Sequence, residues 1–351
     1  MRLHVLHPDR RLPANPVDGP VHELRDAYGR VIRDLRVSLT DRCNFRCVYC
    51  MEPDVVFKRK MELLTDFEII RVVRICQSLG VRRVRLTGGE PTVHPTLPEL
   101  IGDLAALGLE DLSMTSNGSL VSEADLVALR DAGLRRITFS LDSLEQERFA
   151  RLTRSTTTPE RVLMSVRAAK RVGLDPVRIN AVIVRGFNED EVVDLAALAR
   201  DLDADVRLIE YMPLDSGHRW SQDKLVSADE IIDRVSSVFP LVPVERERSS
   251  SPAARFRFAD GAPGMFGVIA SVTRPFCGAC SRLRLSADGM VIPCLFSTSE
   301  YDLRSLIRAP ATTDEQIAQF LAAATLRKQA GHAIHDANYR QPDRPMSAIG
   351  G

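Results

Sequence analysis

Apolar and polar residues alternate along short segments of this chain, and longer amphipathic segments separate them. The alternating pattern predicts strands at 35–39, 82–86, 111–115, 136–141, 177–184 and 206–212. Helical periodicity predicts helices at 66–79, 97–107, 123–132, 159–172 and 189–202, most of them followed by a glycine. Strands that alternate regularly with helices predict a parallel sheet with the helices on its outer face.

Six such units are too few to close an eight-stranded barrel, but they suit an open one. We therefore predict an α/β fold with a partial, six-unit β/α barrel, and a doubly wound sheet is the alternative. The alternation stops near Trp220, after which predicted helices near 227–239 and 313–328 flank a β-rich segment at 255–296. The predicted organisation is a disordered N-terminal extension at 1–20, the barrel at 21–220 and a C-terminal region at 221–351.

One face of the predicted strands is polar, although a strand of a buried parallel sheet is normally apolar on both faces. Residues two apart on a strand share a face, so Arg36, Ser38 and Thr40 lie together. An unpaired buried charge is costly, and the polar face therefore predicts a wet barrel interior. The arginines of this face predict a polyanionic guest such as a phosphate-bearing ligand; they are Arg36, Arg83, Arg85, Arg178 and Arg207. The alternative is that arginines at strand ends pair with Asp or Glu.

Three cysteines follow the first predicted strand at the spacing C-x3-C-x2-C, namely Cys43, Cys47 and Cys50. Clustered thiolates are soft ligands for zinc or for an iron–sulfur cluster. A closed zinc site has four ligands, so three thiolates favour a 4Fe–4S cluster with one iron open to a small molecule. Zinc remains the alternative. We call residues 41–50 the cysteine loop.

A Gly-Gly-Glu-Pro segment follows the second predicted strand. Ligand sites of β/α barrels lie at the C-terminal ends of the strands, which is where both this segment and the cysteine loop fall. Gly88 and Gly89 would let the backbone approach a ligand closely, and Glu90 could bind a cationic group. A plain turn between strand and helix is the alternative.

A second cysteine group consists of Cys277, Cys280 and Cys294. The Asp-Gly pair at 288–289, between alternating apolar residues, predicts a hairpin that places Leu283 opposite Cys294. This hairpin would bring the three cysteines together, again without a fourth.

Two arginines, Arg282 and Arg284, share a strand face beside this second group. We therefore predict a second cluster with an open iron that faces an anionic substrate held by arginines. A zinc site completed by His332 or His335 is the alternative.

The composition removes several classes of protein. The 351 residues are 44% hydrophobic and 27% charged with a net charge of zero, so no overall basic field indicates nucleic acid or membrane. No apolar run approaches the ~20 residues of a membrane span, and the N-terminus has no signal-peptide core. The chain has seven cysteines, which are two groups of three and the lone Cys76. We assign Cys76 to the core. This arrangement is not the disulfide pattern of a secreted protein. A reducing cytoplasm is the predicted compartment.

The chain resembles the radical S-adenosylmethionine (SAM) superfamily. An aromatic residue, Tyr49, precedes the last cysteine of the first group, and the Gly-Gly-Glu-Pro segment follows. More narrowly, the chain resembles the GTP 3′,8-cyclase family of molybdenum cofactor biosynthesis, from about residue 28 to the C-terminus. The matching segments are 34–50, 85–91, 115–118, 140–142, 276–294 and 349–351.

This resemblance implies a lyase that converts GTP to (8S)-3′,8-cyclo-7,8-dihydroguanosine 5′-triphosphate, with SAM and two 4Fe–4S clusters as cofactors. The implied cluster ligands are Cys43, Cys47 and Cys50 for the first and Cys277, Cys280 and Cys294 for the second. The implied SAM contacts are Tyr49, Gly89, Ser140 and Met212.

The same resemblance implies residues that hold GTP, chiefly its triphosphate. They are Arg36, Arg83, Arg85, Thr115, Arg178, Arg282, Leu283 and Arg284, with Arg207 as a further candidate. Relatives often carry Lys at positions 83 and 178, where Arg keeps the charge but changes the geometry. The C-terminal Gly350 and Gly351 are implied to reach into the active site. No side chain is implied to be catalytic, because the radical arises at the SAM-bound cluster.

Implied partners are a flavodoxin- or ferredoxin-like electron donor and a downstream cyclic pyranopterin monophosphate synthase that receives the product. A homodimer stays open, whereas nucleic acid and membrane are not expected. Two other function classes also remain at this point. One is a radical SAM enzyme that modifies peptides, although those commonly have more C-terminal cysteines. The other is a zinc-stapled binding protein without catalysis.

Overall fold

The computed structural model describes residues 19–215, 217–336 and 339–349. Most of the predicted extension at 1–20 therefore lies outside the described residues, and so do the terminal Gly350 and Gly351. Within the described part, the strands and helices follow the predicted order, and the open α/β barrel is confirmed.

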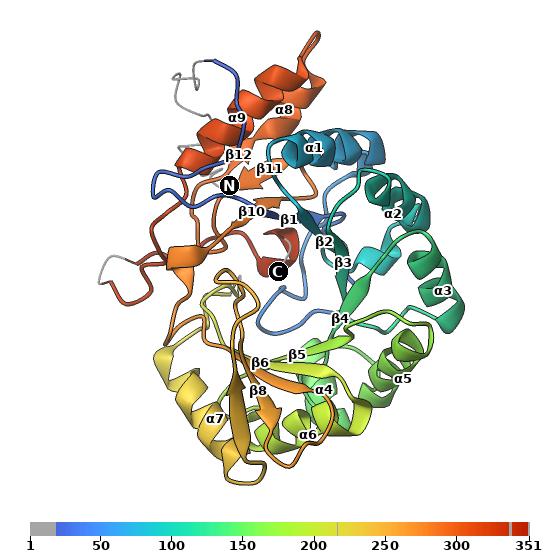
Figure 1. The fold of residues 1–351 in the computed structure, drawn as a ribbon, viewed down its shortest axis with the longest axis vertical. Helices are drawn as coiled ribbons and strands as arrows, with labels where there is room; N and C mark the ends of the chain where they lie inside the picture. Colours follow the sequence, from blue (N-terminus) through green and yellow to red (C-terminus); the bar gives the residue numbers. More distant parts are fainter. Residues whose placement is uncertain (1–18, 216, 337–338, 350–351) are drawn as a thin grey trace.

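The barrel consists of six parallel strands with helices between them. The strands are β1 (Asp34–Ser38), β2 (Arg83–Thr87), β3 (Asp111–Ser116), β4 (Arg136–Ser140), β5 (Arg178–Ile183) and β6 (Asp205–Glu210). The helices between them are α1 (Asp66–Ser78), α2 (Leu97–Ala105), α3 (Glu123–Asp131), α4 (Gln146–Thr153), α5 (Pro159–Arg171) and α6 (Val192–Leu202), and α7 (Ala228–Ser236) follows β6. Figure 1 shows the strands curving around a common centre, with the helices on the outside.

Strands from the last third of the chain extend this sheet at both edges. They are β7 (Leu241–Val244), β8 (Ala254–Phe258) and β9 (Met265–Ile269) at one edge, and β10 (Arg282–Leu285), β11 (Met290–Ile292) and β12 (Tyr301–Asp302) at the other. The order is β12-β11-β10-β1-β2-β3-β4-β5-β6-β9-β8-β7, and the sheet remains open. Strand β10 runs parallel to β1, and β9 runs parallel to β6. The second cysteine group is thus fixed directly beside the first strand of the barrel.

Three more helices complete the C-terminal part, namely α8 (Leu303–Arg308), α9 (Asp314–Leu326) and α10 (Met346–Ile349). The short red helix α10 lies inside the curve of the sheet (Figure 1). Every strand after residue 221 lies outside β1–β6 in the sheet order, which supports the division at about residue 220, and that division stays a proposal.

Local signals explain where the helices begin and end. Thr65 caps α1 in a capping box with Glu68, and Thr158 caps α5 with Pro159 in its first turn. Gly80 follows the C-cap residue of α1 and has a φ of 94°, a conformation that glycine adopts without strain.

The predicted boundaries were wrong by a few residues in places. The helix predicted from residue 189 begins with a 3₁₀ turn at Glu189–Glu191, and α6 follows it. Helices α4 and α8 and strands β7 and β12 were not predicted. The hairpin register is also off by one, because Arg284 pairs with Ile292, which leaves Cys294 beyond the end of β11.

The hydrophobic core lies between the sheet and the outer helices. Leu35 and Val37 of β1 are buried in it, together with Leu86 of β2 and Phe139 of β4. Cys76 of α1 is fully buried there, as predicted. Since these residues alternate with the polar ones on each strand, the arginines face the barrel interior.

A buried carboxylate, Glu210, joins the end of β6 to two other segments. Its side chain is 0% exposed and accepts hydrogen bonds from the backbone N–H groups of Ala228 (2.8 Å), Val272 (2.7 Å) and Thr273 (2.9 Å). Replacing it leaves these buried donors without partners, which is costly.

We expect Glu210→Ala to lower the free energy of unfolding by about 3 kcal/mol, because several charge-assisted bonds are lost together. Chemical denaturation measures this change. Asp103→Ala, at an exposed position of α2, is the control and should change stability by less than ~0.5 kcal/mol. Equal stabilities for the two variants would contradict the role given to Glu210.

Candidate functional site

Three neighbouring cavities lie inside the barrel. The cysteine-loop cavity contains Cys43, Cys47 and Cys50, and the central cavity contains Cys277, Cys280 and Cys294. The first two cavities share the lining residues Tyr49, Thr115, Ser140, Asp142 and Met346. The third cavity, which we call the lower cavity, is lined by residues at the starts of the strands, among them Asp34, Arg83 and Asp111. It shares Arg36, Arg85, Asn180 and Arg282 with the central cavity. The shared residues place the two cysteine groups and the arginines around adjacent cavities.

The first cysteine group lies in a partly buried loop. The backbone N–H of Phe45 donates to Cys43 Sγ at 3.3 Å, and Asn117 Nδ2 donates to it at 3.8 Å. Burial raises the pKa of the Cys43 thiol to about 11 and that of Cys50 to about 12. Metal ligation requires thiolates, so iron binding here would release protons.

The Gly-Gly pair packs against the backbone of the cysteine loop. A Cβ on Gly89 would lie 2.1 Å from the carbonyl oxygen of Arg42, and one on Gly88 would lie 2.7 Å from that of Thr40. The N–H of Gly89 donates to Thr40 O at 2.7 Å. The two glycines were predicted to let the backbone approach a ligand closely. In the structure they let it approach the cysteine loop.

Glu90, the next residue, also contacts the cysteine loop, because its backbone N–H donates to the carbonyl of Arg42 at 2.8 Å. Its buried carboxylate accepts hydrogen bonds from the N–H of Asn117 (2.7 Å) and from the Ser116 hydroxyl (2.8 Å). It also accepts from Thr92. The side chain therefore ties the end of β3 to the loop after β2, and the cationic partner considered above is not needed to satisfy it.

Tyr49 is fixed by a carboxylate at the end of β4. Its hydroxyl donates to Asp142 Oδ2 at 2.5 Å, and the N–H of Val182 donates to Oδ1 at 2.8 Å. Burial raises the pKa of Asp142 to about 6. Asp142 was not predicted as a site residue, although it follows Ser140 on the same strand face.

The predicted SAM contacts all line these cavities. Gly89 lines the cysteine-loop cavity, Met212 lines the central one, and Tyr49 and Ser140 line both. The structure thus brings together residues from four different strand ends.

Around the second cysteine group, positive charges are concentrated. Nε and Nη2 of Arg282 lie 3.4 Å from Cys280 Sγ, and the buried Lys328 donates to the carbonyl of Arg282 at 2.8 Å. Burial opposes ionisation of Cys280, but Arg282 and Lys328 lower the pKa of its thiol to about 6. Lys328 was missed by the sequence analysis, because its position at the end of a predicted helix gives no sign that it is buried.

The zinc alternative receives no support from the described residues. His332 bonds to the carbonyl of Ser271 at 2.6 Å, and His335 bonds to that of Val272 at 3.0 Å. No set of three or more His, Cys, Asp or Glu side chains in the described ranges is grouped tightly enough for a single metal ion.

The predicted substrate residues divide between two cavities. Arg36, Arg85, Thr115, Arg282 and Arg284 line the central cavity. Burial lowers the pKa of Arg284 to about 10. Leu283 is different, because its side chain is fully buried in the hydrophobic core between the two arginines of β10.

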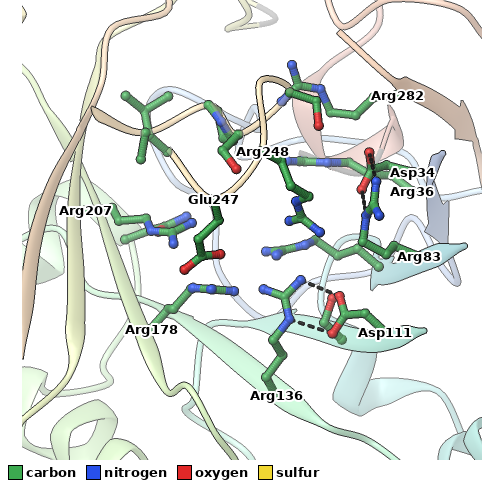
Figure 2. A pocket seen from close by; sticks show the side chains of 18 of the residues that line it. Asp34, Arg36, Arg83, Asp111, Arg136, Arg178, Arg207, Glu247, Arg248 and Arg282 are labelled. Atoms are coloured by element: carbon green, nitrogen blue, oxygen red, sulfur yellow. Dashed lines mark hydrogen bonds and ion pairs between the residues drawn. The ribbon is translucent and has the colours of Figure 1, made fainter. Parts of the chain in front are cut away.

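The remaining predicted arginines line the lower cavity and pair with carboxylates at strand starts (Figure 2). Arg83 Nε lies 2.6 Å from Asp34, and both Arg178 (3.0 Å) and Arg207 (2.6 Å) contact Asp205. The alternative of paired strand-end arginines therefore holds for these three, although they still face the cavity. Arg136, which was not predicted, lines it too.

The C-terminal helix α10 reaches this space. Met346 lines the cysteine-loop and central cavities, and Ser347 hydrogen-bonds to Cys50. Arg284 Nη1 donates to the carbonyl of Ile349 at 3.4 Å. The predicted positions of Gly350 and Gly351 lie outside the described residues.

Comparisons with known proteins agree with these observations. A family model described as the radical SAM superfamily matches residues 37–199, and one described as Molybdenum Cofactor Synthesis C matches residues 204–334. The GTP 3′,8-cyclase of Streptomyces coelicolor is 47% identical over 94% of this chain and 97% of its own length. That of Mycolicibacterium smegmatis is 45% identical over 96% and 93%.

Among solved structures, SuiB of Streptococcus suis bound to S-adenosylmethionine has a TM-score of 0.60 at 14% identity, covering 81% of this chain and 68% of that one. This likeness supports the fold alone. In the described ranges, no helix is long and apolar enough to cross a membrane.

We expect Gly89→Ala to loosen the cysteine loop, because its Cβ would overlap the Arg42 carbonyl. Amide hydrogen exchange of residues 40–46 should become at least tenfold faster, which corresponds to about 1.4 kcal/mol. Gly102→Ala in α2 is the matched control, since a Cβ there meets nothing within 4 Å. Unchanged exchange in Gly89→Ala would show that the close packing is not required.

Proposed function

The chain belongs to the GTP 3′,8-cyclases of the radical SAM superfamily, and from this we propose which of its residues hold the cofactors and the substrate. The enzyme converts GTP to (8S)-3′,8-cyclo-7,8-dihydroguanosine 5′-triphosphate, the first step of molybdenum cofactor biosynthesis. When bound, a reduced 4Fe–4S cluster and SAM supply the 5′-deoxyadenosyl radical that removes hydrogen from C3′ of GTP.

We assign Cys43, Cys47 and Cys50 to that cluster, because they are the three thiols of one cavity. Gly89, Ser140, Met212 and Tyr49 would contact SAM. Asp142 would position Tyr49 for this contact, because it accepts the tyrosine hydroxyl and is itself held by the backbone N–H of Val182 in β5.

A second 4Fe–4S cluster would be held by Cys277, Cys280 and Cys294. The support is the concentration of positive charge around Cys280, which favours thiolate, and the place of all three cysteines in the central cavity. Arg282 and Lys328 would also offset the negative charge of a thiolate-bound cluster.

GTP would lie in the central cavity with its triphosphate in the lower one. The single observation that carries this assignment is that the two cavities share lining arginines. Arg36 and Arg85 line both cavities, so they can hold a ligand that extends from the cysteines to the strand starts. Arginines bind phosphate oxygens with parallel hydrogen bonds and thereby fix orientation. The remaining proposed contacts are Arg83, Thr115, Arg178, Arg207, Arg282 and Arg284. Leu283 is withdrawn as a contact, because its side chain lies in the hydrophobic core and lines neither cavity.

The other partners follow from the chemistry. Each turnover needs two electrons, one for the reductive cleavage of SAM and one, with a proton, to reduce the cyclised nucleotide after hydrogen has been removed from C3′. We therefore propose a flavodoxin- or ferredoxin-like donor, and the product would pass to a cyclic pyranopterin monophosphate synthase. Seven cysteines, free among the described residues, support a reducing cytoplasm.

The direct test is anaerobic incubation of the reconstituted enzyme with dithionite, SAM and GTP, followed by mass spectrometry of the nucleotide. The cyclised triphosphate should form together with 5′-deoxyadenosine. If 5′-deoxyadenosine forms while GTP is recovered unchanged, the substrate assignment is wrong.

Arg284→Ala separates substrate binding from cofactor chemistry. We expect GTP to bind at least tenfold more weakly, since a buried charge-assisted contact is lost, while reductive cleavage of SAM persists. Equilibrium binding and 5′-deoxyadenosine formation measure the two properties. Arg257→Ala, exposed on β8, is the control. Loss of SAM cleavage with normal GTP binding would reverse the assignment.

Iron analysis tests the second cluster. The wild type should hold about eight irons per chain and Cys280→Ala about four, with SAM cleavage retained. Cys43→Ala should lose SAM cleavage, whereas Cys76→Ala, a core position, should keep all of its iron. A wild type with only about four irons would refute the second cluster.

A further inference from the structure

The hairpin that connects β7 to β8 forms one wall of the lower cavity. Its tip residues Glu247 and Arg248 line the cavity with Ser250 and Ser251. Figure 2 shows Glu247 directing its carboxylate into the ring of arginines, with Arg248 extending from the same tip. This hairpin lies outside the β/α units, and none of the predicted site residues belongs to it.

Charge in the lower cavity is strongly unbalanced. Nine arginines and three carboxylates line it. Two of the carboxylates are on barrel strands and already pair with strand arginines, Asp34 with Arg83 and Asp111 with Arg136. The third is Glu247, which pairs with Arg255. Glu247 is therefore the anion that a loop, rather than the barrel itself, brings to the arginines.

The two members of this pair differ in accessibility. The side chain of Glu247 is 60% exposed, whereas that of Arg255 is 16% exposed. Arg255 Nε is buried and has no hydrogen-bond partner among the described residues. An incoming anion could therefore take the place of the carboxylate and also satisfy this donor.

Like charges nearby make such an anion favourable. Burial, together with Arg36, Arg136 and Arg207, lowers the pKa of Arg85 well below its usual range. A phosphate beside these guanidinium groups would relieve that repulsion more than a single carboxylate does, because it carries more charge.

We propose that the hairpin tip makes the lower cavity select for a triphosphate. Glu247 occupies the place of the terminal phosphate before GTP binds and leaves it when GTP binds. Arg248 then contacts that phosphate. This inference rests on the proposed binding of GTP in these cavities. The carboxylate and the terminal phosphate repel each other, so both cannot occupy the arginine ring. A guanine nucleotide with one phosphate does not displace Glu247 and gains nothing from Arg248. The hairpin thus distinguishes nucleotides by the number of their phosphates.

The test measures dissociation constants of GTP and GMP with the reconstituted enzyme at constant salt. Glu247→Gln removes the competing charge and should tighten GTP binding about fivefold, and Arg248→Ala should weaken it about tenfold. The affinity for GMP should change less than about twofold in both variants. Glu245→Gln and Arg246→Ala are matched controls, because both residues are exposed on the same hairpin and do not line the cavity.

Two results would overturn the proposal. One is that both tip variants bind GTP as their controls do. The other is that GMP affinity shifts as much as GTP affinity, which would indicate a general charge effect. If the wild type converts GTP and only the variants fail to differ, the inference alone is wrong. If the wild type neither binds nor converts GTP, the proposed function fails and the inference with it.

Discussion

Mutual repulsion among arginines inside the barrel is the constraint on which the rest of this structure depends. Burial and, after it, like charge lower the pKa values of Arg36 and Arg85 well below their usual range, so positive charge in the centre of the barrel is unfavourable by itself. The fold compensates for part of it with carboxylates at the starts of strands, as in the contact of Asp205 with Arg178. The positive charge that these carboxylates do not offset favours the binding of a polyanion.

The two cysteine groups are placed by the same barrel from opposite directions in the chain. The first follows β1 directly. The second arrives through β10, which pairs in parallel with β1, so residues more than two hundred positions apart become neighbours. Arg282 and Arg284 come with that strand and join Arg36 in the central cavity. The strand pairing therefore brings the residues proposed to hold the second cluster and those proposed to hold the substrate into one cavity.

Much of this arrangement could be predicted from the sequence. The alternation of Arg36 with Leu35 and Val37 identified the inner face of β1. The spacing of Cys43, Cys47 and Cys50 predicted a common site, and these three cysteines line one cavity. Contacts between distant segments could not be predicted in this way. The bond from Tyr49 to Asp142 and the burial of Lys328 depend on how loops meet in space. The one-residue error in the β10–β11 register arose because an Asp-Gly pair indicates a turn without fixing how many residues it contains.

The central claim is that the arginines hold GTP so that its ribose lies beside the cofactor at the first cysteine group. GTP deuterated at C3′ tests this claim most directly. In an anaerobic turnover with SAM, mass spectrometry should find the deuterium in 5′-deoxyadenosine, because the radical abstracts the hydrogen that the bound nucleotide presents to it. If 5′-deoxyadenosine forms without deuterium while GTP is bound, the ribose is not presented to the radical, and the account of this site is contradicted.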